Sequence, residues 1–271
     1  MSRRVWIIGP VAIDIVAYVD SLPRQGSFTR PKKIEERLGG SSANVAIALA
    51  SAGIETGFIS YIGDDGEGAK IKEHFSKSAI DHLHLQKIDG PTNRALVMVD
   101  QSGDRTIVSL SQSHLSEVTL DGIDFDSDDI VVFSLWRPFF IEHLRRVQSL
   151  GCMTILGLEA LADRNVSSAD CLVGSEAELM GEDPISHLDR FPRIVVTRGA
   201  AGSDEYTKTG VRHQPSLATA VVDATGAGDS FLAGFLRVLA RGSEGEPSEY
   251  GARWAAASLA IEGSQPAPPP L

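Results

Sequence analysis

Short apolar segments that alternate with helical segments constrain the fold of this chain more than any other feature. Apolar strands are predicted over residues 5–8, 12–19, 57–62, 130–135, 153–156, 171–173 and 194–197. Helices are predicted over residues 41–52, 67–79, 139–150, 226–240 and 247–262. Apolar strands separated by helices are typical of βα units, in which a parallel sheet is covered on both faces. The pattern therefore predicts an α/β fold.

A hairpin signal interrupts this alternation. Residues 95–99 and 106–110 are apolar and flank the turn sequence Asp100-Gln-Ser-Gly-Asp. Two such runs around a polar, glycine-containing turn predict a pair of antiparallel strands. We therefore expect a small β flap beside the main sheet.

Charge and cysteine content narrow the range of partners and compartments. The chain has 25 Lys and Arg against 36 Asp and Glu, a net charge of −11. Such a surface repels nucleic acid and anionic membranes, although a local basic pocket can still bind a phosphate. Asp14 interrupts the apolar N-terminal run, which we interpret as a buried strand rather than a signal peptide. Two cysteines, Cys152 and Cys171, are too few for a disulfide framework and indicate a cytoplasmic location.

The strongest chemical signal is the segment 221–231, V-V-D-A-T-G-A-G-D-S-F. We predict a strand that ends at Asp223, a tight turn at Gly226 and Gly228, and a long apolar helix directly after it. The first N–H groups of a helix lack internal partners and its dipole is positive there, so the turn is suited to bind a phosphate. Asp229 in the first turn is either a favourable helix-start residue or a base for an attacking hydroxyl in phosphoryl transfer.

The run D-A-T-G-A-G-D-S-F, together with G-G-S-S-A-N at residues 39–44, resembles the paired signatures of the PfkB (ribokinase-like) family of carbohydrate kinases. The resemblance extends over nearly the whole chain through short segments at residues 9–14, 21–23, 63–68, 196–202 and 263–266. It implies a single kinase domain, residues 1–271, with a three-layer α/β/α architecture and a mostly parallel central sheet. A small β lid would be formed by about 14–38 and 82–112.

The resemblance also implies an activity, the ATP-dependent phosphorylation of a hydroxyl, in this family a primary one, on a sugar or sugar derivative. Asp229 would then be the catalytic base, and the backbone of Gly226, Ala227 and Gly228 would form the anion hole. The sugar would be bound by Asp14 and Asn44, with Gly39 and Gly40 as the hinge under the lid. The alternative roles are structural, with Asp14 capping a strand end and Asn44 capping a helix.

On the nucleotide side the resemblance assigns Thr197, Gly199, Gly202 and Gly263 to ATP. The β-rich segment 210–217 would flank the adenine. Asp223 and Thr225 match the first ligands of the monovalent cation, usually K⁺, that many family members bind beside the anion hole. The alternative for Asp223 is a carboxylate that caps its own loop.

The magnesium side departs from the family pattern. Where the family often has N-x-x-E, this chain has Ser175-Glu176-Ala-Glu178. Glu178 would support the Mg²⁺ that accompanies ATP, and Glu176 is a competing choice. Alternatively, Ser175 and Glu178 form a helix capping box.

The substrate is less defined by the sequence. The motif G-G-S-S-A-N differs from the G-G-K-G-A-N of ribokinases proper, and Trp136 is either a changed site wall or a core aromatic. Arg94 and Arg105 on the predicted flap are either solvated surface charges or contacts for an anionic substrate. A neutral hexose or pentose is the default. A nucleoside kinase and a catalytically inert sugar- and nucleotide-binding regulator are the alternatives, and pairing of lids between subunits would give a homodimer.

Overall fold

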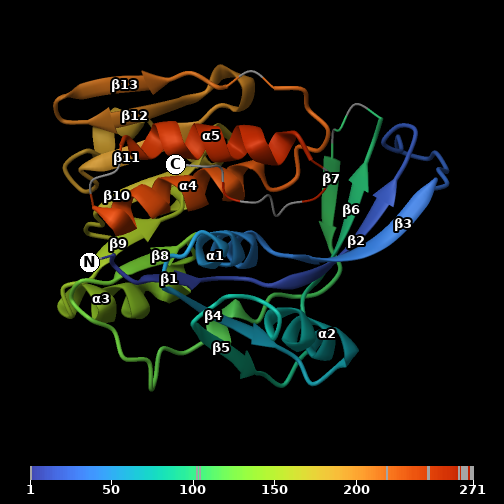
Figure 1. Ribbon diagram of the computed structural model, residues 1–271, viewed down its shortest axis with the longest axis horizontal. Helices are drawn as coiled ribbons and strands as arrows, with labels where there is room; N and C mark the ends of the chain where they lie inside the picture. Colours follow the sequence, from blue (N-terminus) through green and yellow to red (C-terminus); the bar gives the residue numbers. More distant parts are fainter. Residues whose placement is uncertain are drawn as a thin grey trace.

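A single large sheet forms the centre of the molecule (Figure 1). The structure is a computed structural model that describes residues 2–101, 103, 105–217, 219–242, 245–261, 263 and 268. Within these residues the sheet has nine strands in the order β13-β12-β11-β10-β9-β8-β1-β4-β5. Their bounds are β1 (Val5–Ile8), β4 (Thr56–Ile62), β5 (His82–Lys87), β8 (Ile130–Phe133), β9 (Met153–Leu156), β10 (Cys171–Ser175), β11 (Arg193–Thr197), β12 (Ser203–Thr207) and β13 (Gly210–Gln214). Strands from β11 to β5 pair in parallel, and β12 and β13 add an antiparallel edge.

Helices cover both faces of this sheet, as β1 illustrates. Successive side chains of a strand point to opposite faces, and Val5 and Ile7 pack in one core cluster while Trp6 and Ile8 pack in another. Helices α1 (Ser41–Ser51), α2 (Gly66–Phe75), α4 (Ala227–Arg241) and α5 (Pro247–Leu259) contribute to the first cluster. The second contains α3 (Ile141–Ser149). The predicted α/β/α layers are thus confirmed.

Short 3₁₀ turns connect several of these elements. They are η1 (Leu115–Glu117), η2 (Pro138–Phe140), η3 (Leu158–Leu161), η4 (Glu176–Leu179), η5 (Pro184–His187) and η6 (Gly199–Ala201). Three of them, η3, η4 and η6, directly follow the carboxyl ends of parallel strands, the edge at which ligands bind in open α/β sheets.

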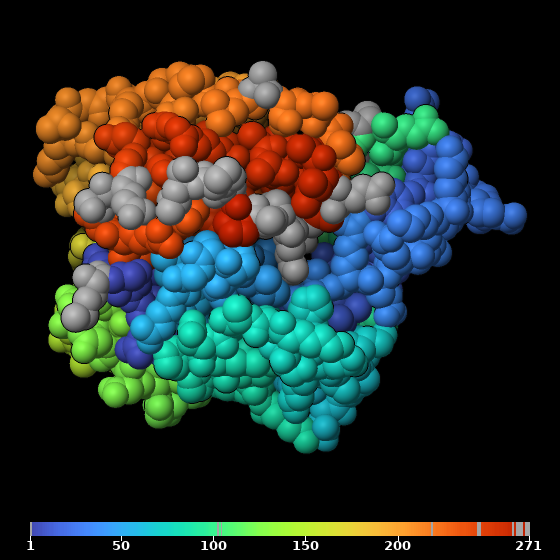
Figure 2. Space-filling view, viewed as in Figure 1, coloured from blue at the N-terminus to red at the C-terminus, as the bar shows by residue number. Residues whose placement is uncertain are grey.

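A second, smaller sheet stands at one end of the molecule, on the right in Figure 1. Its described strands are β2 (Ala12–Tyr18), β3 (Lys33–Gly39), β6 (Arg94–Val99) and β7 (Arg105–Ser109), in the order β3-β2-β6-β7. The antiparallel pairing of β6 with β7 confirms the predicted hairpin. In Figure 2 the part formed by β2 and β3, in blue, projects from the body of the molecule. We call these four strands the lid sheet.

Two predictions about strands differ from the structure. Residues 82–87, within the range 82–112 assigned to the lid, form β5 and pair with β4 in the main sheet. The strand predicted to end at Asp223 is not formed by residues 219–223. Val221 and Val222 are 59% and 54% exposed, and none of the described strands pairs with them. The Val222 amide instead donates to the carbonyl oxygen of Leu259 at 2.7 Å.

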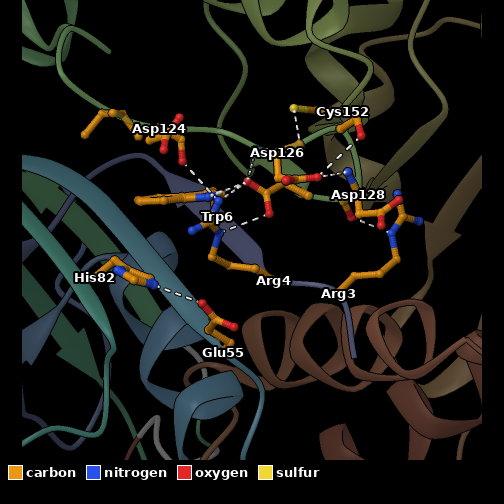
Figure 3. A network of polar contacts seen from close by, with 12 residues as sticks. Arg3, Arg4, Trp6, Glu55, His82, Asp124, Asp126, Asp128 and Cys152 are labelled. Atoms are coloured by element: carbon orange, nitrogen blue, oxygen red, sulfur yellow. Dashed lines mark hydrogen bonds and ion pairs between the residues drawn. The ribbon is translucent and has the colours of Figure 1, made fainter. Parts of the chain in front are cut away.

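An ion-pair network anchors the N-terminal segment to the loop before β8 (Figure 3). The carboxylate of Asp129, which is 3% exposed, accepts from Arg4 Nη2 at 2.7 Å and from the indole Nε1 of Trp6 at 3.0 Å. It also accepts from the amide of Asp126 at 2.8 Å. The rings of Trp6 and His82 stack at 5.5 Å, so this histidine is part of the packing around β1.

Two further observations concern compartment and membrane. Cys152 and Cys171 are buried and form no disulfide. Among the described residues, no helix has the length and apolar character needed to span a bilayer.

We predict that Asp129→Ala lowers the free energy of unfolding by about 2–4 kcal/mol, because it leaves the buried Trp6 donor and the Arg4 guanidinium without their acceptor. Urea denaturation measures this change. Asp121→Ala is the control, since Asp121 is a surface carboxylate, 89% exposed, that lies 3.5 Å from Arg146. Its removal should change stability by less than about 0.5 kcal/mol. Equal effects of the two substitutions would contradict the prediction.

Candidate active site

Two helices from opposite ends of the sequence meet at Asp229. Helix α4 begins at Ala227, and its N-cap is Gly226, whose φ of 76° is a left-handed conformation that favours glycine. Asp229 lies in the first turn, where its Oδ2 accepts a hydrogen bond from Asn44 Nδ2 of α1 at 2.8 Å. Asn44 therefore does not cap α1, which is capped at Gly40. Its buried amide instead holds the carboxylate of Asp229 in place.

The loop before α4 leaves room for a ligand. A Cβ built on Gly228 would meet no heavy atom within 4 Å, and Gly228 is exposed. The first N–H groups of α4 are the ones that lack intrahelical partners, and they lie beside this space. The turn predicted at Gly226 and Gly228 therefore leads directly into α4, with free space beside Gly228.

The two consecutive glycines Gly39 and Gly40 allow close packing at the base of the lid sheet. A Cβ on Gly39 would lie 2.1 Å from Asp14 Oδ2, and a Cβ on Gly40 would lie 2.6 Å from the carbonyl oxygen of Pro10. Asp14 itself lies within β2, opposite Arg37 of β3, so it does not cap a strand end. Its carboxylate rests directly over Gly39, at the edge where α1 begins.

Burial shifts the ionisation of both candidate carboxyl groups in the same direction. Desolvation raises the pKa of Asp229 to about 6, against the opposing effects of the Asn44 hydrogen bond and of the Arg105 charge. Desolvation likewise raises the pKa of Asp14 to about 6, against the Arg37 charge. The charge of Asp14 also contributes to the raised pKa of Asp229, so the two groups share one electrostatic environment. Raised pKa values of this kind cluster at functional sites.

Two arginines of the lid sheet reach the loop before α4. Arg37 Nη1 lies 3.4 Å from Asp223 Oδ2, and Arg105 Nη1 donates to the carbonyl oxygen of Ala224 at 2.9 Å. Arg94 is different. In the lid sheet Arg94 lies beside Ile13, the residue before Asp14, so its side chain is on the other face of the sheet from Asp14. Its Nε lies 3.7 Å from Glu67 of α2. Arg94 therefore occupies the lid face opposite to Asp14, and Arg105 is the arginine of the two that lies near the site.

Asp223 organises the loop that leads into α4. Its Oδ1 accepts from the Thr225 amide at 2.8 Å, and its Oδ2 accepts from the Gly263 amide at 3.0 Å. The carboxylate thus caps its own loop and joins Gly263 to it. Residues 264–266 of the segment 263–266, which resembles the family, lie outside the described residues.

The segment assigned to ATP follows the carboxyl end of β11. Thr197 is the last residue of β11, and its hydroxyl donates to the carbonyl oxygen of Gly174 at 3.2 Å. Gly199 and Gly202 have φ values of 54° and 90°. A Cβ on Gly202 would lie 2.2 Å from the carbonyl oxygen of Gln214, so this turn requires glycine to pack against the end of β13.

Two glutamates meet on the side assigned to magnesium. Glu178 and Ser175 form the capping box of η4, with the Ser175 amide donating to Glu178 Oε2 at 3.2 Å. Burial and the charge of Glu159 raise the pKa of Glu178. Glu159 receives a hydrogen bond from Arg137 at 3.0 Å, but its other oxygen, Oε2, is buried without a hydrogen-bond partner in the described structure. The sequence interpretation missed Glu159, whose only signal is its position three residues after β9.

Some candidate features prove to be structural or lie elsewhere. Trp136 is 1% exposed, and its indole donates to Asp163 Oδ2 at 3.0 Å, so it is a core aromatic. Glu176 is exposed and pairs with Arg198. A cavity of about 660 Å³ is lined by Cys152, Asp170 and Pro192, among others. These residues precede β9, β10 and β11, so the cavity lies at the amino ends of the strands, away from the glycine-rich loop.

Comparisons with known proteins agree with this geometry. The sequence pattern of the pfkB family carbohydrate kinases matches residues 2–135 and 166–270. The chain is 28% identical to the ATP-dependent ribose-1-phosphate kinase of Halopiger xanaduensis, over 98% of this chain and 95% of the relative. Among solved structures it is similar to Burkholderia thailandensis nucleoside kinase in complex with inosine, with a TM-score of 0.83, 16% identity and coverage of 98% and 93% of the two chains. Arabidopsis thaliana ribokinase complexed with ribose and ATP gives a TM-score of 0.75, 23% identity and coverage of 98% and 96%.

We predict that Asp229→Asn raises the melting temperature at pH 7.5, because an ionised carboxylate at this position is less stable than it is in water. The pKa of Asp229 is about 6 in the folded protein and about 3.9 in the unfolded chain. The folded protein therefore loses stability as the pH rises from about 4 through 6, while Asp229 becomes ionised. The difference in melting temperature between variant and wild type should therefore grow from pH 4 to pH 6 and level off above about pH 7. A difference independent of pH would contradict the raised pKa.

Proposed function

The chain belongs to the pfkB family of carbohydrate kinases, and we propose that it transfers the γ-phosphoryl group of ATP to a hydroxyl, a primary one, of a sugar or sugar derivative. One observation carries the proposal above all others. The Asp229 carboxylate is held by Asn44 in the first turn of α4, beside a glycine-rich loop with open space. A base and an anion site side by side are what the attack of a hydroxyl on a phosphate requires.

In this proposal Asp229 accepts the proton of the attacking hydroxyl. Asn44 engages Oδ2, and we assign Oδ1 to the acceptor hydroxyl. A pKa of about 6 leaves the carboxylate ionised at neutral pH and places it nearer the operating pH than an ordinary aspartate, which suits a general base. Asp14, on strand β2 of the lid sheet, would accept hydrogen bonds from two further hydroxyls of the sugar.

The loop before α4 would stabilise the charge of the transferring phosphoryl group. The backbone N–H groups of Gly226, Ala227 and Gly228 are oriented in advance by the helix, so they cost little reorganisation during the reaction. The lid sheet would exclude water, which competes with the sugar for the phosphoryl group. Gly39 and Gly40, at the junction of β3 with α1, would be the hinge of the lid.

The nucleotide would lie on the side of Thr197, Gly199, Gly202 and Gly263. Glu159 and Glu178 fit the Mg²⁺ that accompanies it, because Mg²⁺ is commonly held by one or two carboxylates together with substrate phosphates. The unpartnered Oε2 of Glu159 is a ready acceptor for a metal-bound water. When bound, Mg²⁺ neutralises charge that develops on the phosphates.

The acceptor class is a neutral sugar in the first instance, with a nucleoside as the second candidate. On the lid face that bears Asp14, three valines are buried and pack with Tyr18, namely Val16, Val97 and Val99. An apolar wall in this place favours a flat, partly apolar acceptor such as a nucleoside. Arg105 beside the glycine-rich loop would favour an anionic acceptor, such as the substrate named for the relative from Halopiger.

Exposed apolar residues of the lid sheet favour a homodimer. The lid face opposite to Asp14 bears Ile34 and Val108, which are 61% and 44% exposed. We propose that two lids cover this face in a homodimer.

The two buried thiols and the net charge of −11 suit a cytoplasmic protein that binds small molecules rather than nucleic acid or membranes.

We predict that Asp229→Asn lowers kcat by about 10²- to 10⁴-fold, the usual contribution of a general base. Coupled ADP release with Mg-ATP, against a panel of hexoses, pentoses, sugar phosphates, sugar acids and nucleosides, first identifies the acceptor. The kcat/KM of the wild type should fall below about pH 6, as the base becomes protonated. Asp121→Asn is the control for a surface carboxylate. Unchanged turnover by Asp229→Asn would refute the role of this residue, and binding of ATP and sugar without ADP release would indicate a regulator instead of an enzyme.

We predict that Glu159→Gln and Glu178→Gln each raise the Mg²⁺ concentration for half-maximal activity about tenfold, because a neutral amide orders a metal-bound water less well. Mg²⁺ titration at saturating ATP measures this. Glu176→Gln is the matched control, since this neighbouring exposed glutamate pairs with Arg198. A larger effect of Glu176→Gln than of the other two would transfer the metal-side role to Glu176.

A further inference from the structure

The buried carboxylate of Asp223 accepts a hydrogen bond from the protein on each of its two oxygens. Asp223 is 6% exposed. Its Oδ1 accepts from the Thr225 amide and its Oδ2 from the Gly263 amide, at 2.8 and 3.0 Å. The guanidinium of Arg37 also lies 3.4 Å from Oδ2. Two of these donors are neutral, so Arg37 is the group that compensates the charge.

The Arg37 side chain is fixed in the position that this contact needs. Its Nε donates to Glu35 Oε1 at 2.8 Å, and its Nη2 donates to the hydroxyl of Tyr18. The side chain of Arg37 is 17% exposed and that of Asp223 is 8% exposed. An ion pair so far removed from water is screened little by salt, and its geometry is set by strands β2 and β3 rather than by a flexible surface chain.

A monovalent cation, which the family resemblance assigns to Asp223 and Thr225, does not fit this arrangement. Both oxygens of Asp223 accept from protein donors, and a guanidinium already lies on the side of Oδ2. A buried carboxylate needs one positive partner, and a further cation at Asp223 would lie against a guanidinium that is already held between Asp223 and Glu35.

We propose that Arg37 takes the place of the monovalent cation, so that the kinase works without K⁺. The inference rests on the proposed function. Arg37 also lies opposite Asp14 in the β2–β3 register, so one guanidinium links the sugar-side carboxylate to the loop that would bind the phosphate. Since β3 belongs to the lid sheet, the lid itself delivers the compensating charge to the loop.

The first test compares K⁺, Na⁺ and tetramethylammonium chlorides at equal ionic strength. The kcat of the wild type should agree within about twofold in the three salts, because the compensating charge is covalently part of the chain. The melting temperature and the affinity for a non-hydrolysable ATP analogue should also be equal in the three salts. These two measurements need no turnover, so they test the proposal even if the phosphoryl acceptor is wrongly assigned. Activation by K⁺ of about tenfold or more over tetramethylammonium, or a rise in melting temperature specific to K⁺, would overturn it.

The second test removes the guanidinium. Arg37→Met keeps the aliphatic stem, and its kcat in tetramethylammonium should fall by about tenfold or more, with part of the loss restored by K⁺. Arg37→Lys keeps the charge and should remain insensitive to K⁺. Lys70→Met is the matched control, because Lys70 pairs with Glu36 of the same strand at the surface, 2.5 Å away. A K⁺ response of Arg37→Met no greater than that of Lys70→Met would overturn the proposal.

Discussion

The hydrogen bond between Asn44 and Asp229 is the interaction on which the site depends. It joins α1 to α4 across a sequence separation of 185 residues, and both helices belong to the same core cluster on one face of the sheet. A bond of this kind has a fixed geometry because the helices that carry it are fixed by packing. The orientation of the carboxylate is therefore a property of the whole α/β core.

Bringing carboxylates together under the lid sheet costs free energy, and the structure compensates for the cost locally. Asp14 and Asp229 each have a pKa raised to about 6 by burial, so their ionised forms destabilise the fold at neutral pH. Asp223 is also buried, but hydrogen bonds from Thr225 and Gly263 and the charge of Arg37 outweigh the desolvation and lower its pKa. The negative charges of Asp14 and Asp229, which are proposed to act on the substrate, are thus less well stabilised than the charge of Asp223, which holds the loop. Such a difference is what a trade-off between stability and function requires.

The sequence was sufficient for the layers and for the main motif, because both are expressed locally. Alternating apolar segments predicted the parallel sheet, and the run from Asp223 to Asp229 predicted the turn at the start of α4. Residues whose role depends on tertiary placement could not be predicted from the sequence. Glu159 becomes notable only when η3 and η4 bring it beside Glu178, and Arg94 and Arg105 are separated only by the register of the lid strands. Val221 and Val222 favour a strand locally, but none of the strands that the structure describes pairs with them.

The lid sheet illustrates how one register decides function. Because side chains alternate across a strand, Arg37 and Asp14 lie opposite each other on one face, while Glu36 on the other face pairs with Lys70 of α2. A shift of one residue in β3 would turn Arg37 toward α2 and leave Asp223 without its charged partner. A shift that placed Leu38 at the position of Gly39 would bring a side chain against Asp14, because a Cβ there would lie 2.1 Å from Asp14 Oδ2. Gly39 at the end of β3 therefore favours the register on which the contact between Arg37 and Asp223 depends.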